Sequence, residues 1–192
     1  AALKKILGDH IEQKGSLVEE GRLRFDFAHS KQVSSKEITE IENLVNLQIE
    51  KNIKSVTEIM TIEEATKKNA IAFFGEKYGE KVRVLNIGDG FSIELCGGTH
   101  VKSTGEIEIF KFTSESGISA GVRRVEAVTG KKALDLLREY EDSLKEISSN
   151  LNTPIENVVK RIQQIQLENK NLATEIKKLR KESISSSNNQ IS

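Results

Sequence analysis

The sequence predicts an α+β fold, with an antiparallel sheet and helices, followed by a helical hairpin or coiled coil. Three observations support this. Short segments of alternating polar and apolar residues are separated by glycines up to Gly130. The same region contains two capping boxes, Ser34–Glu37 and Thr61–Glu64, each of which begins a helix. After Gly130 no glycine occurs, and the apolar residues take heptad spacing.

The first elements are a helix and a strand. Apolar residues recur at helical spacing from the first turn, which predicts a helix that ends near Lys14, with Gly15 in the left-handed conformation after it. A half-buried strand is expected next, over residues 22–27, because its apolar side chains alternate: Leu23, Phe25 and Phe27.

Further helices and strands follow up to Gly130. The box at Ser34 opens a helix with one apolar stripe, and the box at Thr61 opens a short helix through Ala65. Gly75 and Gly79 interrupt the pattern after it, and Gly88-Asp89-Gly90 is typical of a hairpin turn. The expected strands cover residues 55–60, 81–87, 91–95, 106–112 and 122–128.

Two helices are predicted in the last third of the chain. Thr153 is the expected N-cap of the second, with Pro154 at its first position and Glu156 completing a capping box. The short joint between the helices favours an antiparallel hairpin. Alternatively, the second helix pairs with another copy through residues 154–183, since its seam carries Ile at one heptad position, Leu, Ile or Val at the other, and a single Asn169.

These patterns divide the chain into three parts. Residues 1–130 form the α+β domain and residues 131–183 a coiled-coil-like helical segment. Residues 184–192 are expected to be disordered, because the chain is rich in Ser and Asn from Ser183 onward. The helical pattern is already under way at Ala1, without an initiator Met or a cap. We therefore interpret the domain as N-terminally truncated.

Composition limits the classes of function. The 192 residues contain 29 Lys+Arg and 29 Asp+Glu, so there is no global basic character, and a nucleic-acid partner would be held by local patches. No apolar run is long enough to span a bilayer, which predicts no membrane association. The single cysteine cannot form an internal disulfide and fits a cytoplasmic location.

The sharpest chemical feature is the segment Cys96-Gly97-Gly98-Thr99-His100, which directly follows a predicted strand. Cys and His four residues apart on a glycine-rich turn can direct a thiolate and an imidazole at one cation, and both are standard zinc ligands. Two ligands do not complete a zinc site, and neither His10 nor His29 has a second partner at ligand spacing. The alternative is a buried cysteine and a hydrogen-bonded histidine beside a tight turn.

Several segments, in this order, resemble the alanyl-tRNA synthetase family over nearly the whole chain. They are Gln13-Lys14-Gly15-Ser16-Leu17-Val18, Arg22-Leu23-Arg24-Phe25-Asp26-Phe27, Phe74-Gly75-Glu76-Lys77-Tyr78-Gly79, Val82-Arg83-Val84-Leu85, Glu94-Leu95-Cys96-Gly97-Gly98-Thr99-His100-Val101, Thr104-Gly105-Glu106-Ile107 and Gly121-Val122-Arg123-Arg124-Val125-Glu126-Ala127-Val128-Thr129-Gly130.

The resemblance implies an editing domain that hydrolyses mischarged Ser-tRNA(Ala) and Gly-tRNA(Ala), with the tRNA(Ala) acceptor end as its partner. It implies zinc held by Cys96 and His100 together with a histidine pair that lies before residue 1, so zinc binding is expected to be weakened or absent in this chain alone. Gln13 matches a polar editing-site residue of the family. The parent enzyme ligates alanine to tRNA(Ala) with ATP and Mg²⁺, in a ligase domain that this chain lacks.

Further residues are predicted to belong to the same site. The predicted catalytic residues are Gln13, Cys96 and Asp26, and the predicted substrate-binding residues are Gly97, Gly98, Thr99 and Arg123. Asp26 faces away from Phe25 and Phe27, so it either lines a cleft or bonds to solvent or a turn. The neighbours Arg123 and Arg124 point to opposite faces of their strand. We predict that Arg123 contacts a tRNA phosphate and that Arg124 forms a structural ion pair.

Two other functions are considered beside this one. The first is a free-standing trans-editing protein or a threonyl-type editing domain, against which the helical tail argues. The second is a non-catalytic tRNA-binding module. Hydrolysis of mischarged tRNA separates the editing functions from the binding module.

Overall fold

The computed structural model describes residues 1–68, 70–71, 79–88 and 90–188 and confirms the α+β class. The chain divides into two compact units, Ala1–Leu136 and Leu137–Ser192. The division falls inside helix α4 (Gly130–Asn150), a little beyond the expected boundary at residue 130.

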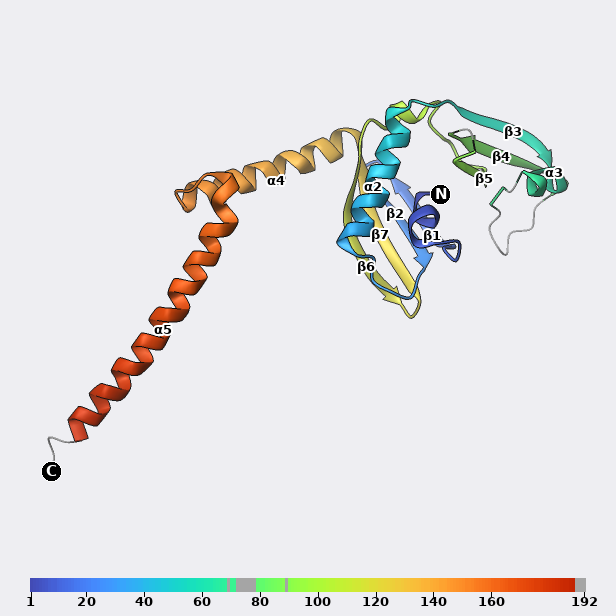
Figure 1. Cartoon of the computed structure of the whole chain (residues 1–192). Helices are drawn as coiled ribbons and strands as arrows, with labels where there is room; N and C mark the ends of the chain where they lie inside the picture. The colour runs from blue at the N-terminus through green and yellow to red at the C-terminus, as the bar shows by residue number, and fades with distance from the viewer. Residues whose placement is uncertain (69, 72–78, 89, 189–192) are drawn as a thin grey trace. The chain divides into compact units, whose positions relative to one another are not determined.

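The first unit contains two antiparallel sheets where one was expected (Figure 1). The larger has the order β1 (Gln13–Glu19), β2 (Arg22–Ala28), β7 (Val122–Thr129) and β6 (Phe110–Ser119). The smaller has the order β3 (Ser55–Thr61), β4 (Lys81–Ile87) and β5 (Ser92–Leu95). Two sheets form because β2 pairs with the distant β7, while β3 follows the intervening helix and pairs with β4.

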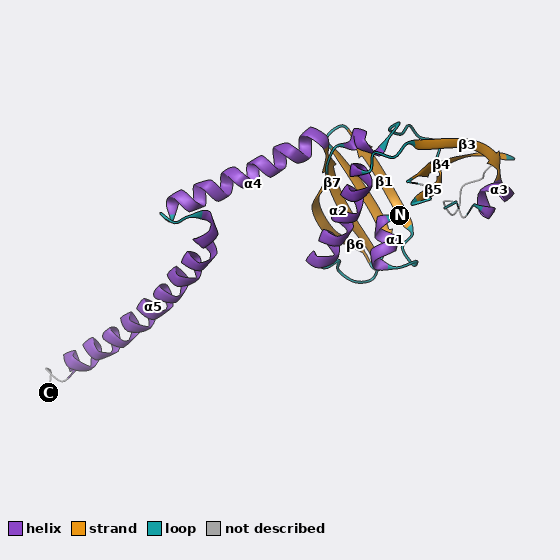
Figure 2. Ribbon diagram, turned by 45° about the horizontal axis from the view of Figure 1, so that its top comes forward, coloured by secondary structure: helices purple, strands orange, loops and turns teal. Residues whose placement is uncertain are grey.

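Two helices, α1 (Ala2–Leu7) and α2 (Ser35–Glu50), lie against the larger sheet (Figure 2). The main core lies between these helices and the sheet. Phe27, Ile41 and Val125 are almost fully buried there. The register pairs Phe25 with Val125, so their neighbours Asp26 and Arg124 share the opposite face of the sheet. Alternation on β2 therefore separates the core from a polar face, as the sequence predicts.

The smaller sheet has a core of its own. Val82, Val84 and Leu95 pack against Ala65 of helix α3 (Ile62–Lys67). Buried Thr104, in a 3-10 helix over Thr104–Ile107, connects this part to α2: its hydroxyl donates to the Gln48 carbonyl (2.7 Å) and accepts from the Ile53 amide (2.9 Å).

Both predicted capping boxes in this unit are confirmed. The Ser34 hydroxyl accepts from the Glu37 amide, and the Glu37 carboxylate accepts from the Ser34 amide. Thr61 and Glu64 form the same pair of bonds at the start of α3. Each box satisfies two amides that the first turn leaves without helical partners.

The predicted end of the first helix is wrong. Helix α1 ends at Leu7, because Gly8 takes a φ of 113° that right-handed helix cannot continue through. Residues 13–19, expected to be the helix end and the loop after it, form strand β1. Its backbone groups bond to β2 in an antiparallel pair. The sheet therefore satisfies these amides and carbonyls in place of helical bonds.

The strand predicted at residues 106–112 begins later than expected. The 3-10 helix occupies Thr104–Ile107, Glu108 has a φ of 64°, and β6 starts at Phe110. The remaining strands agree closely with the prediction, and Ile87 pairs with Ser92 across the predicted hairpin. The predictions at Gly75 and Asp89 lie outside the described residues.

The second unit continues α4 and contains α5 (Val158–Asn188). The capping box predicted at Thr153 is wrong: its hydroxyl donates to the Leu151 carbonyl (3.1 Å), and Pro154 is extended, with a ψ of 148°. A 3-10 turn over Ile155–Asn157 precedes α5, which continues to Asn188 through residues expected to be disordered. Residues 189–192 are not described.

In the part of the chain that the structure describes, α4 and α5 are not among the elements that pack closely together, so the expected antiparallel hairpin is not seen there. Their apolar stripes are exposed: Leu144 at 44%, Leu172 at 55% and Leu179 at 57%. Self-association through residues 154–183 therefore stays a prediction. None of the described helices is both long and apolar enough to cross a bilayer.

Candidate functional site

Cys96 and His100 face each other on the turn that follows β5. His100 Nε2 lies 3.0 Å from Cys96 Sγ. Cys96 is half-buried and His100 exposed. Between them, Gly97 and Gly98 are exposed, and a Cβ built on Gly98 would lie 3.6 Å from Sγ, in ordinary contact. The turn therefore brings thiol and imidazole together, as the spacing predicts.

The two side chains suit a zinc ion chemically. Bonds of about 2.3 Å to sulfur and about 2.0–2.1 Å to nitrogen place two such donors about 3.6 Å apart on a tetrahedral ion. The present separation of 3.0 Å is about 0.6 Å shorter, so the two side chains would move slightly apart to share an ion. Within the described residues, no group of three or more His, Cys, Asp or Glu is placed to hold a metal ion. Cys96 and His100 thus fit half of a four-ligand site.

The surroundings of His100 favour its neutral form. Loss of hydration around the ring lowers the pKa of His100 below its usual value, the Arg83 guanidinium lowers it further, and Glu94 opposes both. Neutral imidazole is the form that ligates metals and accepts a proton. At neutral pH this side chain is therefore ready to act as a ligand.

A cavity of about 560 Å³ lies in the same unit. Gln13, Glu94 and Ile71 line it together with the apolar face of the larger sheet. Glu94 belongs to β5, the strand that leads directly into Cys96, and its carboxylate accepts from the Ser92 hydroxyl (2.7 Å). Its lining also includes the charged residues Lys4, Asp9, Glu12 and Lys14, so the cavity combines apolar walls with polar groups and suits a small polar molecule.

The structure brings only some of the predicted site residues together. Gln13 lines the cavity, whereas Cys96, His100, Asp26 and Arg123 are not among the described residues that line it. Gly97, Gly98 and Thr99 lie exposed on the Cys96–His100 turn. Sequence reasoning did not select Glu94. Its position two residues before Cys96 on a short strand was the available signal.

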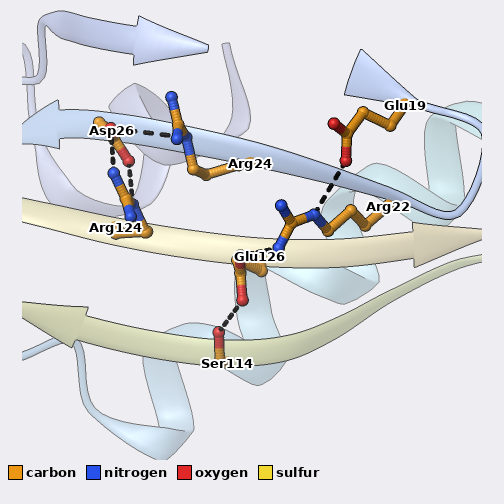
Figure 3. Close-up of polar contacts among 7 residues, drawn as sticks. All are labelled: Glu19, Arg22, Arg24, Asp26, Ser114, Arg124 and Glu126. Atoms are coloured by element: carbon orange, nitrogen blue, oxygen red, sulfur yellow. Dashed lines mark hydrogen bonds and ion pairs between the residues drawn. The ribbon is translucent and has the colours of Figure 1, made fainter. Parts of the chain in front are cut away.

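Asp26 lies on the polar face of the larger sheet (Figure 3). Its carboxylate accepts two hydrogen bonds from Arg124, 2.7 Å from Nε and 2.9 Å from a terminal nitrogen, and Arg24 lies 3.7 Å away. Asp26 is 6% exposed. These contacts hold the pKa of Asp26 below its usual value, chiefly through the hydrogen bonds from Arg124. Asp26 is thus held in ion pairs within the sheet. Its predicted catalytic role stays a prediction.

We expect Asp26 to make the stability of the chain sensitive to acid. Its pKa is lowered on folding, so its contribution is present above its unfolded pKa of 3.8 and is lost as the pH falls through the folded value. When the pH is lowered from about 6 to about 3, the free energy of unfolding should fall less for Asp26→Asn than for the wild type. Denaturant unfolding at the two pH values measures both losses. The exposed Glu20→Gln is the matched control. An unchanged pH dependence in Asp26→Asn would contradict this assignment.

Both neighbouring arginines are ion-paired. Arg123 donates to Glu115 through Nε (2.6 Å) and a terminal nitrogen (2.7 Å), and the same carboxylate accepts from the Val33 amide (3.4 Å). The Arg123 side chain is 18% exposed and that of Arg124 31%. A phosphate at Arg123 would have to share this guanidinium with Glu115, so its role in tRNA binding stays a prediction.

The remaining histidines pair with each other. His10 Nε2 lies 2.9 Å from His29 Nδ1, and their rings stack with centroids 5.1 Å apart. This contact joins the loop after α1 to the end of β2. Neither residue belongs to a described cluster of metal-ligating side chains.

Known proteins resemble this chain in sequence. Residues 82–126, which contain Cys96 and His100, match the family model described as "Threonyl and Alanyl tRNA synthetase second additional domain". The chain is 51% identical over 179 residues, 93% of its length, to the alanine–tRNA ligase of Coxiella burnetii (strain Dugway 5J108-111). It is 52% identical over 184 residues, 96% of its length, to that of Fervidobacterium nodosum. The identity to that of Pseudomonas syringae pv. tomato is 44% over all 192 residues.

The chain is homologous to one segment of alanine–tRNA ligase. This confirms the resemblance found in the sequence. The chain spans about a fifth of these relatives: 21% of the length of the first two and 22% of the third. The matched domain is the one that the alanyl and threonyl synthetases share.

Proposed function

We propose that this chain is the editing region of an alanine–tRNA ligase and hydrolyses the ester of Ser-tRNA(Ala) and Gly-tRNA(Ala). The observation that carries the proposal is the identity of about half over nearly the whole chain to alanine–tRNA ligases, with the Cys96–His100 pair inside the domain that the family model matches. The parent enzyme would ligate alanine to tRNA(Ala) with ATP and Mg²⁺, and we propose that it acts in the cytoplasm.

Cys96 and His100 would hold zinc together with ligands from the histidine pair that the family resemblance implies. When bound, zinc supplies a Lewis acid that can polarise the ester carbonyl or activate water. The chain's own part is to present a thiolate and a neutral imidazole on one short turn, 3.0 Å apart. The tRNA acceptor end is the substrate in this proposal.

Polar groups in the cavity would allow the site to distinguish a seryl group from an alanyl group. Gln13 offers an amide donor and acceptor, and Glu94 a carboxylate, in the lining of the same cavity. A seryl group can bond through its hydroxyl to such groups, whereas an alanyl group leaves them unpaired at a cost of about 1–3 kcal/mol, roughly 5- to 150-fold in rate. Glycine lacks the hydroxyl, so its hydrolysis would depend on space or on kinetics.

The test measures hydrolysis by the full native polypeptide that contains residues 1–192. Ser-tRNA(Ala) should be hydrolysed faster than Ala-tRNA(Ala) by the factor given above, and Gln13→Ala should reduce that ratio. Faster hydrolysis of Ser-tRNA(Thr) than of Ser-tRNA(Ala) would favour a threonyl-type editing domain. No hydrolysis of any of the three, with tRNA binding intact, would favour a non-catalytic binding module.

A further inference from the structure

Arg83 lies in β4, and its side chain is on the face of the smaller sheet opposite the core formed with Ala65. Its neighbours Val82 and Val84 are 6% and 2% exposed and pack into that core, so alternation places Arg83 on the other face. Arg83 is only half-buried. Its position therefore does not follow from the packing of the small core.

The Arg83 guanidinium bonds to the turn that carries Cys96. One of its terminal nitrogens donates to the carbonyl of Cys96 (2.7 Å) and to that of Gly98 (2.6 Å). The other donates to the Thr57 hydroxyl (3.5 Å), and the Arg83 backbone carbonyl accepts from the Cys96 amide (3.1 Å). Arg83 thus bonds to both the amide and the carbonyl of Cys96 and also to the carbonyl of Gly98.

The turn has few other restraints. From Gly97 to Val101, hydrogen bonds to the described residues involve only the Gly98 carbonyl and the His100 ring. Two adjacent glycines have more backbone freedom to lose than any other pair of residues. Without the guanidinium, few hydrogen bonds would restrain the backbone between Cys96 and His100, and the distance between their metal-binding atoms would vary more.

We propose that Arg83 is a positioning residue, which holds the Cys96–His100 turn in the shape that presents both donors to one metal ion. This inference rests on the proposed function. Arginine suits the task because its planar fork offers several donors at fixed angles and keeps its charge at all physiological pH values. Residues that orient the ligands of a metal site typically change metal affinity by about 10- to 100-fold when replaced.

The test measures metal affinity in the full native polypeptide. Zinc is titrated against a competing chelator, and Co²⁺ is added separately to record the thiolate-to-cobalt charge-transfer band. The variants are Arg83→Gln, Arg83→Lys and Cys96→Ala. The matched control is Arg22→Gln, since Arg22 forms ion pairs with Glu19 and Glu126 on the larger sheet, away from the turn. Circular dichroism and thermal unfolding are recorded for every variant.

We expect Arg83→Gln to weaken zinc binding by about 10- to 100-fold and to shift or weaken the charge-transfer band. Arg83→Lys keeps the charge and loses the fork, so it should restore only part of the affinity. Arg22→Gln should bind zinc as the wild type does.

Two results overturn the proposal in distinguishable ways. If the wild type binds zinc through Cys96 and both Arg83 variants bind it equally well, Arg83 is not a positioning residue, while the editing proposal stands. If Cys96→Ala binds zinc as tightly as the wild type, Cys96 is not a ligand, and the metal site of the proposed function fails together with this inference. Arg83→Lys keeps the test valid if Arg83→Gln does not fold.

Discussion

Replacing Cys96 with alanine should reduce hydrolysis of Ser-tRNA(Ala) by the full native polypeptide by about 100-fold or more. Loss of an orienting residue around a metal already costs about 10- to 100-fold, and Cys96 is proposed as a ligand itself. His100→Ala should have a similar effect, because the two side chains lie 3.0 Å apart and are proposed to share one ion. Deacylation rates and zinc content, measured on the same samples, check the prediction.

The control for this experiment is Ser116→Ala, which removes a small polar group from an exposed position on β6. Its deacylation rate should match that of the wild type. If Cys96→Ala retained the wild-type rate while losing zinc, the metal would not take part in hydrolysis. If it retained both, the alternative of a cysteine and histidine that merely bond beside a tight turn would be correct.

Replacing Phe27 with alanine should lower the free energy of unfolding of the chain by about 3–5 kcal/mol, which is typical of removing a buried aromatic ring. Phe27 is 0% exposed and packs in the core cluster with Ile41 and Val125. Removing the ring leaves a cavity between α2 and the larger sheet that the surrounding backbone can fill only in part. Denaturant unfolding of residues 1–192, followed by circular dichroism, measures the change.

Val18→Ala is the matched control on the same sheet. Val18 is 79% exposed, so its replacement should change the free energy of unfolding by less than about 0.5 kcal/mol. A loss of under about 1 kcal/mol for Phe27→Ala would mean that the core collapses around the smaller side chain, and that the sheet is less rigidly packed than its register implies.

The features that the sequence predicts correctly depend on residues close together in the chain. The boxes at Ser34 and Thr61 close through bonds to residues three positions away. The Cys96–His100 contact spans four positions and needs only one turn. Strand β4 keeps its predicted bounds, and its Val82 and Val84 pack into the core of the smaller sheet. Local spacing was sufficient in each case.

The predictions that fail concern segments whose partners lie elsewhere. Residues 13–19 have apolar residues compatible with a helix end and loop, yet they pair with β2 because the sheet satisfies their backbone groups. Thr153 has the spacing of a cap, but its hydroxyl donates backward to Leu151. The hairpin of α4 and α5 was inferred from a short joint, and a short joint does not by itself make two apolar stripes face each other.

The sequence by itself determined the fold class, two helix starts, most strands, the contact between Cys96 and His100, and the resemblance to alanine–tRNA ligase. Only the tertiary structure decided which residues surround them. Asp26 meets Arg124 across 98 positions, and the Arg83 side chain reaches the Cys96 and Gly98 carbonyls across 13 and 15. The physical reason is that a spacing of three or four residues fixes local geometry, whereas strand pairing and register choose the partners of a side chain from the whole chain.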